Sequence, residues 1–403
     1  MSETAEPHAA SPAVLTGAAS LAAGAFTPLA GKRVGLITNH TGRVGSDHLA
    51  DLMSKAGNLK LTAILAPEHG FRGTAEAGAS VRSGRDARTG VPVFSLYGAT
   101  KKPTPDMLRD VDVLVFDIQD IGVRYYTYIS TMGLAMQAAS ARAIPFVVLD
   151  RPNPLGGEDV SGFMLEPALR SFVGQYPIPI VHGLTVGELA LMIKGERWLD
   201  GLEKLDLTVV PMTGWTRSMR WPATALPWIA TSPNIATFAA ALAYPGIGLV
   251  GETLVNEGRG TPTPFLQFGA SWLDAGRAAA TLNALGLAGV RFEAASTTPR
   301  TIPDVAAHPR FEGQRIGAVR LVITDVATYR PLEVGIHALA LLQYESRARG
   351  AHLFDKLAMF NAISGTGRLH RMLDRGAGGH EIIAAWSAEV DRFKALRTRY
   401  LQY

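Results

Sequence analysis

The stretch of the chain with the most side chains capable of chemistry runs from 112 to 130, DVLVFDIQDIGVRYYTYIS. It opens as an apolar strand, and functional groups follow at once: Asp117, Gln119, Asp120, Arg124, Tyr125, Tyr126 and Tyr128. Because burying such groups is costly unless they are paired, they form either a closed cluster that fixes a loop or part of a ligand site. Open parallel sheets bind ligands beside the carboxyl ends of their strands, so a site is expected here.

Three further apolar strands in the first half end in similar groups. The residues that follow them are Asn39 and His40 after 33–38, Glu68, His69 and Arg72 after 61–65, and Asp150, Arg151 and Asn153 after 146–149. Asn and Asp also make turns and caps, so His40 could simply shape its loop and Asp150 could be a cap. Repetition at the same edge of one sheet nevertheless predicts a shared pocket.

Glu68 and a segment of the second half, 252–260, have surroundings that suggest a role. Phe71 follows Glu68 closely and could desolvate its carboxyl group, which would raise the pKa as a general acid requires. Arg259 has a glycine on each side, which marks a close approach of the backbone. Glu252 and Glu257 stand on either side of a short segment, where capping and surface pairing are their plain interpretation, and we expect only one of them to face a site.

The elements that must position these groups follow from the hydrophobic pattern. Apolar strands alternate with helical segments, which is typical of a parallel sheet covered on both faces. In the first half we expect a helix within 15–29, a helix capped by Ser46 or Asp47 that runs to 55, helices at 132–143 and 185–193, and strands at 33–38, 61–65, 91–96, 113–118, 146–149 and 207–211. In the less regular second half we expect helices at 237–244, 332–345, 353–363 and 380–400, and strands at 290–293 and 318–324.

The chain has 403 residues, which is long for one core, so two domains are expected. A loop rich in Trp, Pro and Thr at 215–234 places the boundary near its end. We therefore predict a mostly parallel α/β domain at 1–235, which carries the strand-end residues, and a smaller α/β or α+β domain at 236–403.

Composition excludes several classes of protein. Hydrophobic residues make up 47% and charged residues 18%, as in a well-packed globular protein. The net charge of +4 is spread over the whole length, which argues against a nucleic-acid surface but suits a small anionic ligand. The absence of cysteine rules out disulfides and thiol chemistry. No uncharged apolar run approaches the roughly 20 residues that span a bilayer, so no membrane partner is expected.

The compartment is left open by the N-terminal segment. Residues 8–31 are uncharged and rich in alanine, but Glu3 and Glu6 precede them where a signal peptide carries basic residues. We expect either a cytoplasmic protein, or a periplasmic or secreted one from which a leader was removed.

Several catalytic motifs are missing. No G-x-G-x-x-G follows the first strand, and the sequence contains no G-x-x-x-x-G-K-[ST], H-E-x-x-H or G-x-S-x-G. Dinucleotide binding, a P-loop, a zincin site and an α/β-hydrolase are therefore not expected. A Mg²⁺ or Ca²⁺ site built from Asp117, Asp120 and Asp150 remains a minority alternative.

Together these residues make the chain resemble the NamZ/YbbC-type exo-β-N-acetylmuramidases, a bacterial family long catalogued as a domain of unknown function. The matching blocks occur in family order over nearly the whole chain: GLITNHTG (35–42), APEHGFRG (66–73), VFSLYG (93–98), VLVFDIQDIGVRYYTYIS (113–130), FVVLDRPNPLGG (146–157), PIPIVHGLTVGELA (177–190), LPWIATSPNI (226–235) and NEGRGT (256–261). Two departures are small. His40 stands where many relatives have proline, and the run 251–253 is a variant that weakens any role for Glu252.

The resemblance implies a Rossmann-like N-terminal domain, a smaller C-terminal α/β domain and a substrate cleft between them. It implies release of N-acetylmuramic acid from non-reducing ends of peptidoglycan fragments, as in cell-wall recycling, without a metal or organic cofactor. The residues that fall in family blocks are Asn39, Glu68, His69, Arg72, Asp117, Gln119, Asp120, Arg124, Tyr126, Asp150, Asn153, His182, Asn234, Glu257 and Arg259.

Within that framework we assign roles as hypotheses. Glycoside cleavage uses a protonated carboxyl group and a second carboxylate, about 5–5.5 Å apart for retention or about 6.5–9.5 Å for inversion. We expect Glu68 to be the general acid, with Glu257 as its partner and Asp120 as the next choice. The arginine that binds the lactyl carboxylate of muramic acid would be Arg72, Arg124 or Arg259. Tyr126 and Trp228 could stack on the sugar, although Trp228 could equally belong to the core.

Two rival functions remain open at this stage. One is a metal-assisted hydrolase or deacetylase of amino sugars, and the other is a two-domain sugar-binding protein that releases its ligand unchanged. The expected partner in every case is a small saccharide rather than a nucleic acid or a membrane, and the protein is expected to be a monomer or a dimer.

Overall fold

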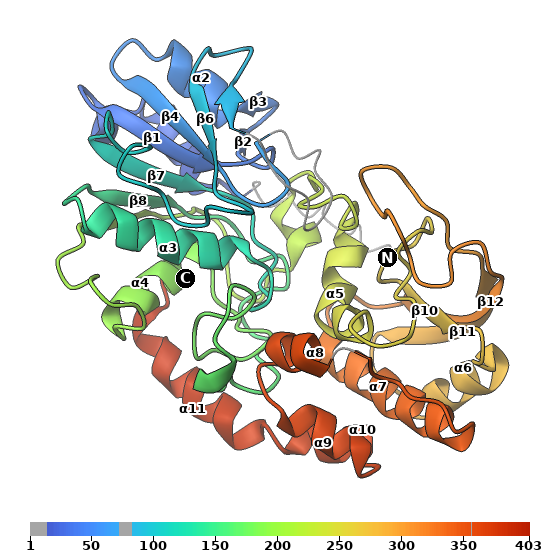
Figure 1. Cartoon of the computed structure of the whole chain (residues 1–403). Helices are drawn as coiled ribbons and strands as arrows, with labels where there is room; N and C mark the ends of the chain where they lie inside the picture. Colours follow the sequence, from blue (N-terminus) through green and yellow to red (C-terminus); the bar gives the residue numbers. More distant parts are fainter. Residues whose placement is uncertain (1–13, 72–82, 356) are drawn as a thin grey trace, which may run out of the picture.

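The computed structural model of the chain describes residues 14–71, 83–355 and 357–403. Figure 1 shows two lobes side by side. The first lobe carries a large, mostly parallel sheet, and the second carries a smaller antiparallel sheet with most of the C-terminal helices. The expected two-part α/β fold is confirmed.

Within the described residues, the first lobe is built on a seven-stranded sheet in the order β5-β6-β4-β1-β7-β8-β9. Adjacent strands pair in parallel, except that β5 and β6 are antiparallel. The strands are β1 (Arg33–Thr38), β4 (Lys60–Ala66), β5 (Gly84–Arg85), β6 (Pro92–Ser95), β7 (Val113–Asp117), β8 (Phe146–Leu149) and β9 (Leu207–Val210). From β1, the next strands of the sheet, β4 and β6, are added on one side, whereas β7, β8 and β9 are added on the other. The strand order therefore reverses between β1 and β7. Doubly wound sheets bind ligands at such a point.

Each face of this sheet is covered by helices, as its buried strands require. Helices α1 (Gly17–Ala23) and α2 (Leu49–Lys55) contribute Leu21 and Leu49 to the core on one face. Helices α3 (Tyr128–Ser140) and α4 (Val186–Gly195) contribute Met132 and Leu189 to the core on the other. The side chain of Thr185 caps α4, and Thr185 and Glu188 together form a capping box.

The second lobe contains an antiparallel sheet in the order β10-β12-β11, made of β10 (Gln267–Ala270), β11 (Val290–Thr297) and β12 (Ile316–Ile323). Its helices are α5 (Phe238–Val250), α6 (Ala275–Asn283), α7 (Pro331–Ala348), α8 (Leu357–Ser364), α9 (Arg368–Asp374), α10 (Gly379–Ala384) and α11 (Ser387–Arg397). Helices α5 and α7 cross at Gly246 and Gly335, where a Cβ on either residue would overlap the facing backbone.

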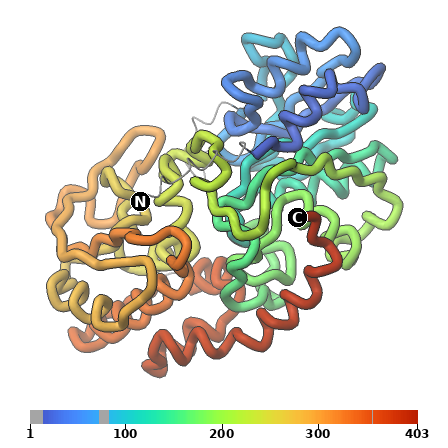
Figure 2. Tube along the Cα trace, turned by 180° about the vertical axis from the view of Figure 1, so that it is seen from behind, coloured from blue at the N-terminus to red at the C-terminus, as the bar shows by residue number. Residues whose placement is uncertain are grey.

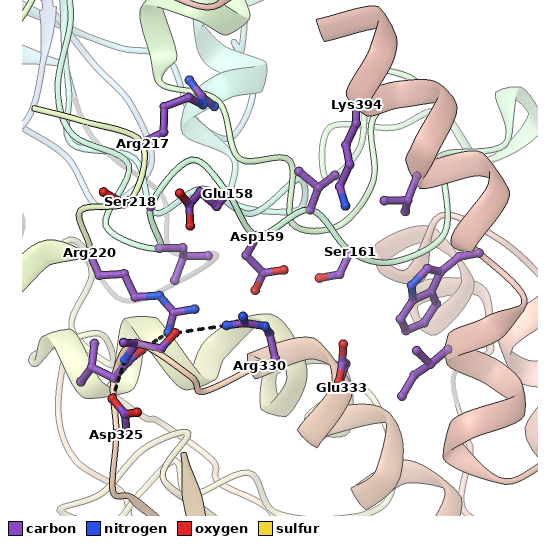
Figure 3. Close-up of a pocket in the computed structure, with 18 of the residues that line it drawn as sticks. Glu158, Asp159, Ser161, Arg217, Ser218, Arg220, Asp325, Arg330, Glu333 and Lys394 are labelled. Carbon is purple, nitrogen blue, oxygen red and sulfur yellow. Dashed lines mark hydrogen bonds between the residues drawn. The ribbon is translucent and has the colours of Figure 1, made fainter. Parts of the chain in front are cut away.

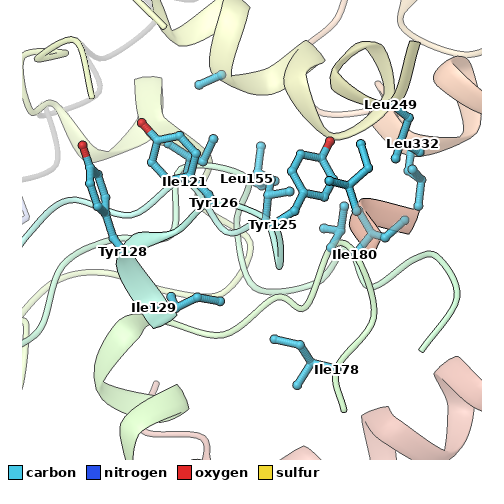
Figure 4. Packing of buried hydrophobic residues seen from close by; sticks show 14 of the residues in the cluster. Ile121, Tyr125, Tyr126, Tyr128, Ile129, Leu155, Ile178, Ile180, Leu249 and Leu332 are labelled. Atoms are coloured by element: carbon cyan, nitrogen blue, oxygen red, sulfur yellow. The ribbon is translucent and has the colours of Figure 1, made fainter. Parts of the chain in front are cut away.

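The two lobes share one hydrophobic core. Tyr125 and Ile180 of the first lobe pack near Leu249 of α5 and Leu332 of α7 (Figure 4). The chain also returns at its end, because α11 runs back beneath the first lobe (Figures 1 and 2). The lobes are therefore joined by side-chain packing as well as by the backbone. None of the helices in the described ranges has the length and apolarity that crossing a membrane demands.

The structure differs from the sequence-based expectations mainly in the second half. The helix expected at 237–244 continues through Pro245 to Val250, and the helix expected at 380–400 is broken at Ala385 and Trp386 into α10 and α11. In the first lobe, α2 is capped by His48 rather than by Ser46 or Asp47, because Asp47 pairs in the short β2–β3 hairpin (Arg43–Val44 with Asp47–His48). The predicted domain boundary at 235/236 lies just before α5.

Candidate active site

A cleft of about 810 Å³ opens between the two lobes. The first lobe lines it with residues that follow β4, β6 and β7, and the second lobe lines it from α5, α8 and the segment around Arg259. Its polar and aromatic lining residues are Glu68, His69, Tyr97, Lys101, Tyr125, Tyr126, Thr127, Ser171, Phe172, Ser232, Asn234, Tyr244, Glu252, Arg259 and Phe265.

Glu68, which follows the end of β4, lines this cleft. The backbone turns sharply after β4, with His69 and Gly70 both at positive φ, 69° and 76°. The Glu68 carboxyl group accepts a hydrogen bond from the hydroxyl of Thr127 at 2.5 Å, and it is hydrogen-bonded to the phenol of Tyr97. Burial and the Glu68 charge raise the pKa of Tyr97, so its hydroxyl keeps its proton and donates. Two hydroxyl groups thus hold Glu68 in place.

Tyr244 is the aromatic centre of the cleft. Its ring lies 5.3 Å from that of Tyr125, 6.0 Å from that of Tyr126 and 4.8 Å from that of Phe265, measured between centroids. Burial raises the pKa of Tyr244, and the charges of Glu68, Glu252 and Glu257 add to the effect. Carboxylates from both lobes therefore act electrostatically on the Tyr244 hydroxyl.

The second lobe adds a cation and a carboxylate to the cleft wall. Arg259 forms an ion pair with Glu257, and its guanidinium lies 5.0 Å from the centroid of Phe265. The side chain of Arg259 is 34% exposed whereas that of Glu257 is only 6% exposed, and Glu257 does not line the cleft. Glu252, just after α5, does line it. The expectation that one of these two acids faces the site therefore fits Glu252, although we had preferred Glu257.

The cleft contains a third of the predicted site residues, namely Glu68, His69, Tyr126, Asn234 and Arg259. The hydroxyl of Tyr126 donates to Thr231, and the amide of Asn234 donates to the carbonyl of Val305. Arg72 lies outside the described residues. The remaining predicted residues lie elsewhere.

Several strand-end groups converge as predicted, but they bind one another rather than line the cleft. Asp117 is fully buried and accepts two hydrogen bonds from the guanidinium of Arg151, at 2.6 and 3.0 Å. The side-chain oxygen of Asn39 accepts from Thr41, and the amide of Gln119 donates to the carbonyls of Asp120 and Pro152. This network fixes the loops at the edge of the sheet, and the structure does not place Asp117, Asn39 or Gln119 in the lining of the cleft at Glu68.

Asp150, Asn153 and Asp120 are also committed within the first lobe. Asp150 accepts hydrogen bonds from Thr185, the N–H of Gly187 and the hydroxyl of Tyr403, and burial raises its pKa to about 6. Asn153 bonds the backbone at Leu155 and Leu184. Asp120 accepts from the N–H of Gly122, and burial raises its pKa to about 7. None of the three lines the cleft, so the geometry does not fit Asp120 as the second catalytic acid.

Arg124 and His182 are buried instead of facing the cleft. Arg124 donates to the carbonyls of Phe163, Ile178 and Ile363, and burial lowers its pKa to about 9. His182 accepts a hydrogen bond from the N–H of Leu184, and burial lowers its pKa to about 3. Arg124 therefore joins the first lobe to the end of α8 and is not placed to bind a substrate carboxylate.

Sequence reasoning missed several lining residues, chiefly Tyr97, Lys101, Thr127, Phe172 and Tyr244. Tyr97 could have been predicted, because it follows the apolar strand 91–96 in the same way that Glu68 follows the strand 61–65. Phe172 and Tyr244 lie in a loop and a helix without any such signal.

Two aromatic residues singled out from the sequence lie away from the cleft. Trp228 packs against Trp221 and Phe238, with ring centroids 5.1 and 6.0 Å away, and is part of the core. Phe71 packs against His48, 5.0 Å between ring centroids, and does not line the cleft.

A second cavity of about 840 Å³ lies elsewhere between the lobes (Figure 3). Loops 155–161 and 217–223 of the first lobe face 325–333 and α11, and Arg220 donates to the carbonyls of Val326 and Tyr329 across the gap. Figure 3 shows Asp159, Arg330 and Glu333 around this space. No residue predicted from the strand ends lines it, so the cleft at Glu68 is the candidate active site.

Metal ligation was the minority alternative for the strand-end acids. Asp117, Asp120 and Asp150 have separate hydrogen-bond partners, as described above. Over residues 14–71, 83–355 and 357–403, His, Asp and Glu side chains form no group of three that would hold a metal ion.

Comparison with known proteins matches this chain along almost its full length. Family models described as exo-beta-N-acetylmuramidase NamZ, N-terminal and C-terminal, match residues 34–239 and 242–403. The peptidoglycan beta-N-acetylmuramidase NamZ of Bacillus subtilis (strain 168) is 43% identical over 399 residues, which cover 97% of this chain and 92% of that protein.

Two crystal structures of DUF1343 family proteins from Bacteroides fragilis NCTC 9343 share the fold. One superimposes with a TM-score of 0.89 at 39% identity and the other with 0.78 at 34%, and each comparison covers 97% of this chain and 99% of the other. The resemblance inferred from the sequence blocks is thereby confirmed. The chain belongs to the exo-β-N-acetylmuramidase NamZ family.

Proposed function

We propose that this protein is an exo-acting glycoside hydrolase that releases N-acetylmuramic acid from the non-reducing ends of peptidoglycan fragments, and that it does so in the cleft at Glu68. The Bacillus subtilis relative is named as a peptidoglycan beta-N-acetylmuramidase, which supports the reaction. The observation that carries the choice of site is the Glu68 carboxyl group, fixed by Thr127 and Tyr97 in a cleft lined with aromatic rings.

Glu68 serves as the general acid that gives its proton to the glycosidic oxygen as the bond to the muramyl carbon breaks. Thr127 and Tyr97 act as positioning residues, because their hydroxyl groups fix the orientation of the carboxyl group. The second carboxylate required by the reaction is Glu252, which lines the cleft from the other lobe. It either attacks the muramyl carbon, giving an ester that water then hydrolyses, or takes a proton from the water that attacks this carbon.

Arg259 is the side chain placed to bind the lactyl carboxylate that distinguishes muramic acid from glucosamine. Its guanidinium is committed to Glu257 on one side and remains partly exposed to the cleft on the other. A guanidinium offers five N–H donors in a planar fork, so one ion pair leaves donors for a substrate carboxylate. The rings of Tyr126 and Tyr244, also in the lining, provide apolar faces for the sugar.

The direct test compares Glu68→Gln with Glu158→Gln on a muramyl-glucosamine disaccharide. Glu158 lines the second cavity, so its replacement removes the same charge away from the proposed site. We expect Glu68→Gln to lower the rate of muramic acid release by about 10²–10⁴-fold, the range typical of lost general acid catalysis, and Glu158→Gln to leave it unchanged. Free muramic acid is measured by chromatography with mass detection.

The same assay separates the rival functions. A sugar-binding protein would bind the disaccharide without releasing muramic acid, and a deacetylase would release acetate instead. Normal turnover by Glu68→Gln, with circular dichroism showing intact folding, would remove Glu68 from the mechanism.

A further inference from the structure

Beyond Glu68, one wall of the cleft continues into a pair of side chains with no assigned role. The ring of Phe172 lies 6.1 Å from that of Tyr97, and the ammonium of Lys101 lies 4.5 Å from the centroid of Phe172. All three residues line the cleft. Phe172 is half-buried and Lys101 is exposed, so both are accessible to a ligand.

Lys101 lines the cleft from the first lobe, and Arg259 lines it from the second. The guanidinium of Arg259 lies 5.0 Å from the centroid of Phe265, whose ring lies 4.8 Å from that of Tyr244. Tyr97 connects Glu68 to the wall that carries Lys101, because its hydroxyl is hydrogen-bonded to Glu68 and its ring lies next to that of Phe172. The cleft therefore presents two cations on separate walls, each packed against an aromatic ring.

We propose that Phe172 and Lys101 form a leaving-group subsite that binds an anionic saccharide. This inference rests on the proposed function and adds the nature of the leaving group. With the terminal muramyl unit bound at Arg259, the glucosamine that departs stacks on Phe172. The next muramyl unit along the strand then places its lactyl or peptide carboxylate at Lys101.

The chemistry of the two side chains fits this occupant. Sugars bind aromatic rings through their apolar C–H faces, and a lysine ammonium is a compact charge that pairs with a carboxylate. Among the described residues, Lys101 contacts a ring but has no carboxylate partner. A neutral leaving group would gain nothing from this lysine, whereas a peptidoglycan strand, in which glucosamine and muramic units alternate, places an acid two units beyond the terminal one.

Kinetics with substrates of increasing length test this subsite. The substrates are β-muramyl fluoride, the muramyl-glucosamine disaccharide and the tetrasaccharide that repeats it once. We expect the wild type to have a higher kcat/KM for the tetrasaccharide than for the disaccharide. Lys101→Met should lower kcat/KM for the tetrasaccharide about tenfold and leave the other two within about twofold, since a charge-assisted contact contributes a little over 1 kcal/mol. Phe172→Ala should impair both saccharides and spare the fluoride.

The adjacent lysine provides a matched control. Lys102 is exposed but does not line the cleft, so Lys102→Met should behave as the wild type. An equal effect of Lys101→Met and Lys102→Met, or equal kcat/KM for disaccharide and tetrasaccharide in the wild type, would overturn the subsite. In either case, turnover of the fluoride and the disaccharide would leave the proposed function intact.

A binding measurement keeps the subsite testable even if hydrolysis fails. In a Glu68→Gln background, calorimetry with the tetrasaccharide should show about tenfold weaker binding for Lys101→Met than for Lys102→Met. Added salt should narrow that difference, because an exposed ion pair is screened. Identical affinities at low salt would reject the proposal without reference to the reaction.

Discussion

Two arginines beside the cleft have opposite surroundings. Arg124 is fully buried and gives its N–H groups to three main-chain carbonyls, whereas Arg259 is partly exposed on the cleft wall. We expect Arg124→Met to lower the free energy of unfolding by about 3 kcal/mol, because buried carbonyls lose their donors. Arg259→Met should instead raise KM for muramyl substrates about tenfold.

Urea denaturation and steady-state kinetics measure the two effects. The rise of KM caused by Arg259→Met should be much smaller for substrate analogues that lack the lactyl group. An equal rise of KM with both kinds of substrate would reject Arg259 as the residue that binds the carboxylate.

The raised pKa of Asp120 should make the free energy of unfolding depend on pH. Burial raises its pKa to about 7 in the folded state, from an ordinary value of 3.8. Between these values the folded protein binds a proton that the unfolded chain does not, so the contribution of Asp120 to stability falls as pH rises through that window. Asp120→Asn cannot ionise, and its stability relative to the wild type should increase between pH 5 and pH 8. A difference that stays constant in urea titrations at the two pH values would contradict a buried ionising group.

Single residues also mark where sequence reasoning reached its limit. Glu68 and Asp117 both follow an apolar strand, and nothing local distinguishes them. Asp117 is paired with Arg151, which follows the end of β8, whereas Glu68 meets the hydroxyl of Tyr97, which follows β6, and that of Thr127, at the start of α3. These partners are set by the three-dimensional packing, so the sequence could predict the cluster but not which acid faces the cleft.

At the scale of elements, the turn after α8 positions a wall of the cleft. Gly365 has φ of 77°, and a Cβ there would overlap the guanidinium of Arg124, which three carbonyls hold in place. We expect Gly365→Ala to destabilise the protein by about 2–4 kcal/mol and to raise KM, because α8 carries Met359 and Ala362 in the cleft lining. Unfolding in urea and steady-state kinetics report the two effects.

Gly376 is the control that distinguishes backbone strain from steric overlap with a neighbouring side chain. It has φ of 86°, but a Cβ there would meet nothing within 4 Å. Gly376→Ala should therefore cost only the backbone strain, about 1 kcal/mol, with KM unchanged. Equal losses of stability in the two variants would show that Arg124 does not fix the position of α8.

Elements were predictable where their determinants are local. β1 and β8 have the predicted bounds, since each is a continuous apolar run, and α4 begins where Thr185 and Glu188 form a capping box. β10 and α6 were not anticipated, and the break between α10 and α11 was missed. Trp386, at that break, packs its buried ring 5.4 Å from Phe163 of the first lobe, a contact that no local pattern encodes.

For the molecule as a whole, the end of the chain ties the second lobe back to the first. Arg397 donates to the carbonyls of His182 and Gly183, and the hydroxyl of Tyr403 donates to Asp150 at 2.8 Å and accepts from the N–H of Met212 at 2.9 Å. With a hydrophobic core that spans both lobes, these bonds should make the protein unfold as one cooperative unit.

Tyr403→Phe tests that cooperativity with a minimal change. It keeps the ring, which packs 5.3 Å from that of Trp215, and removes only the hydroxyl, so we expect a loss of about 1–3 kcal/mol. In scanning calorimetry the wild type should show one endotherm, and the variant should shift that whole endotherm to lower temperature. Tyr344→Phe is the matched control, because Tyr344 is 70% exposed on α7 and should leave the endotherm unchanged. If only part of the heat moved in Tyr403→Phe, the lobes would be unfolding separately, and the shared core would not make them one cooperative unit.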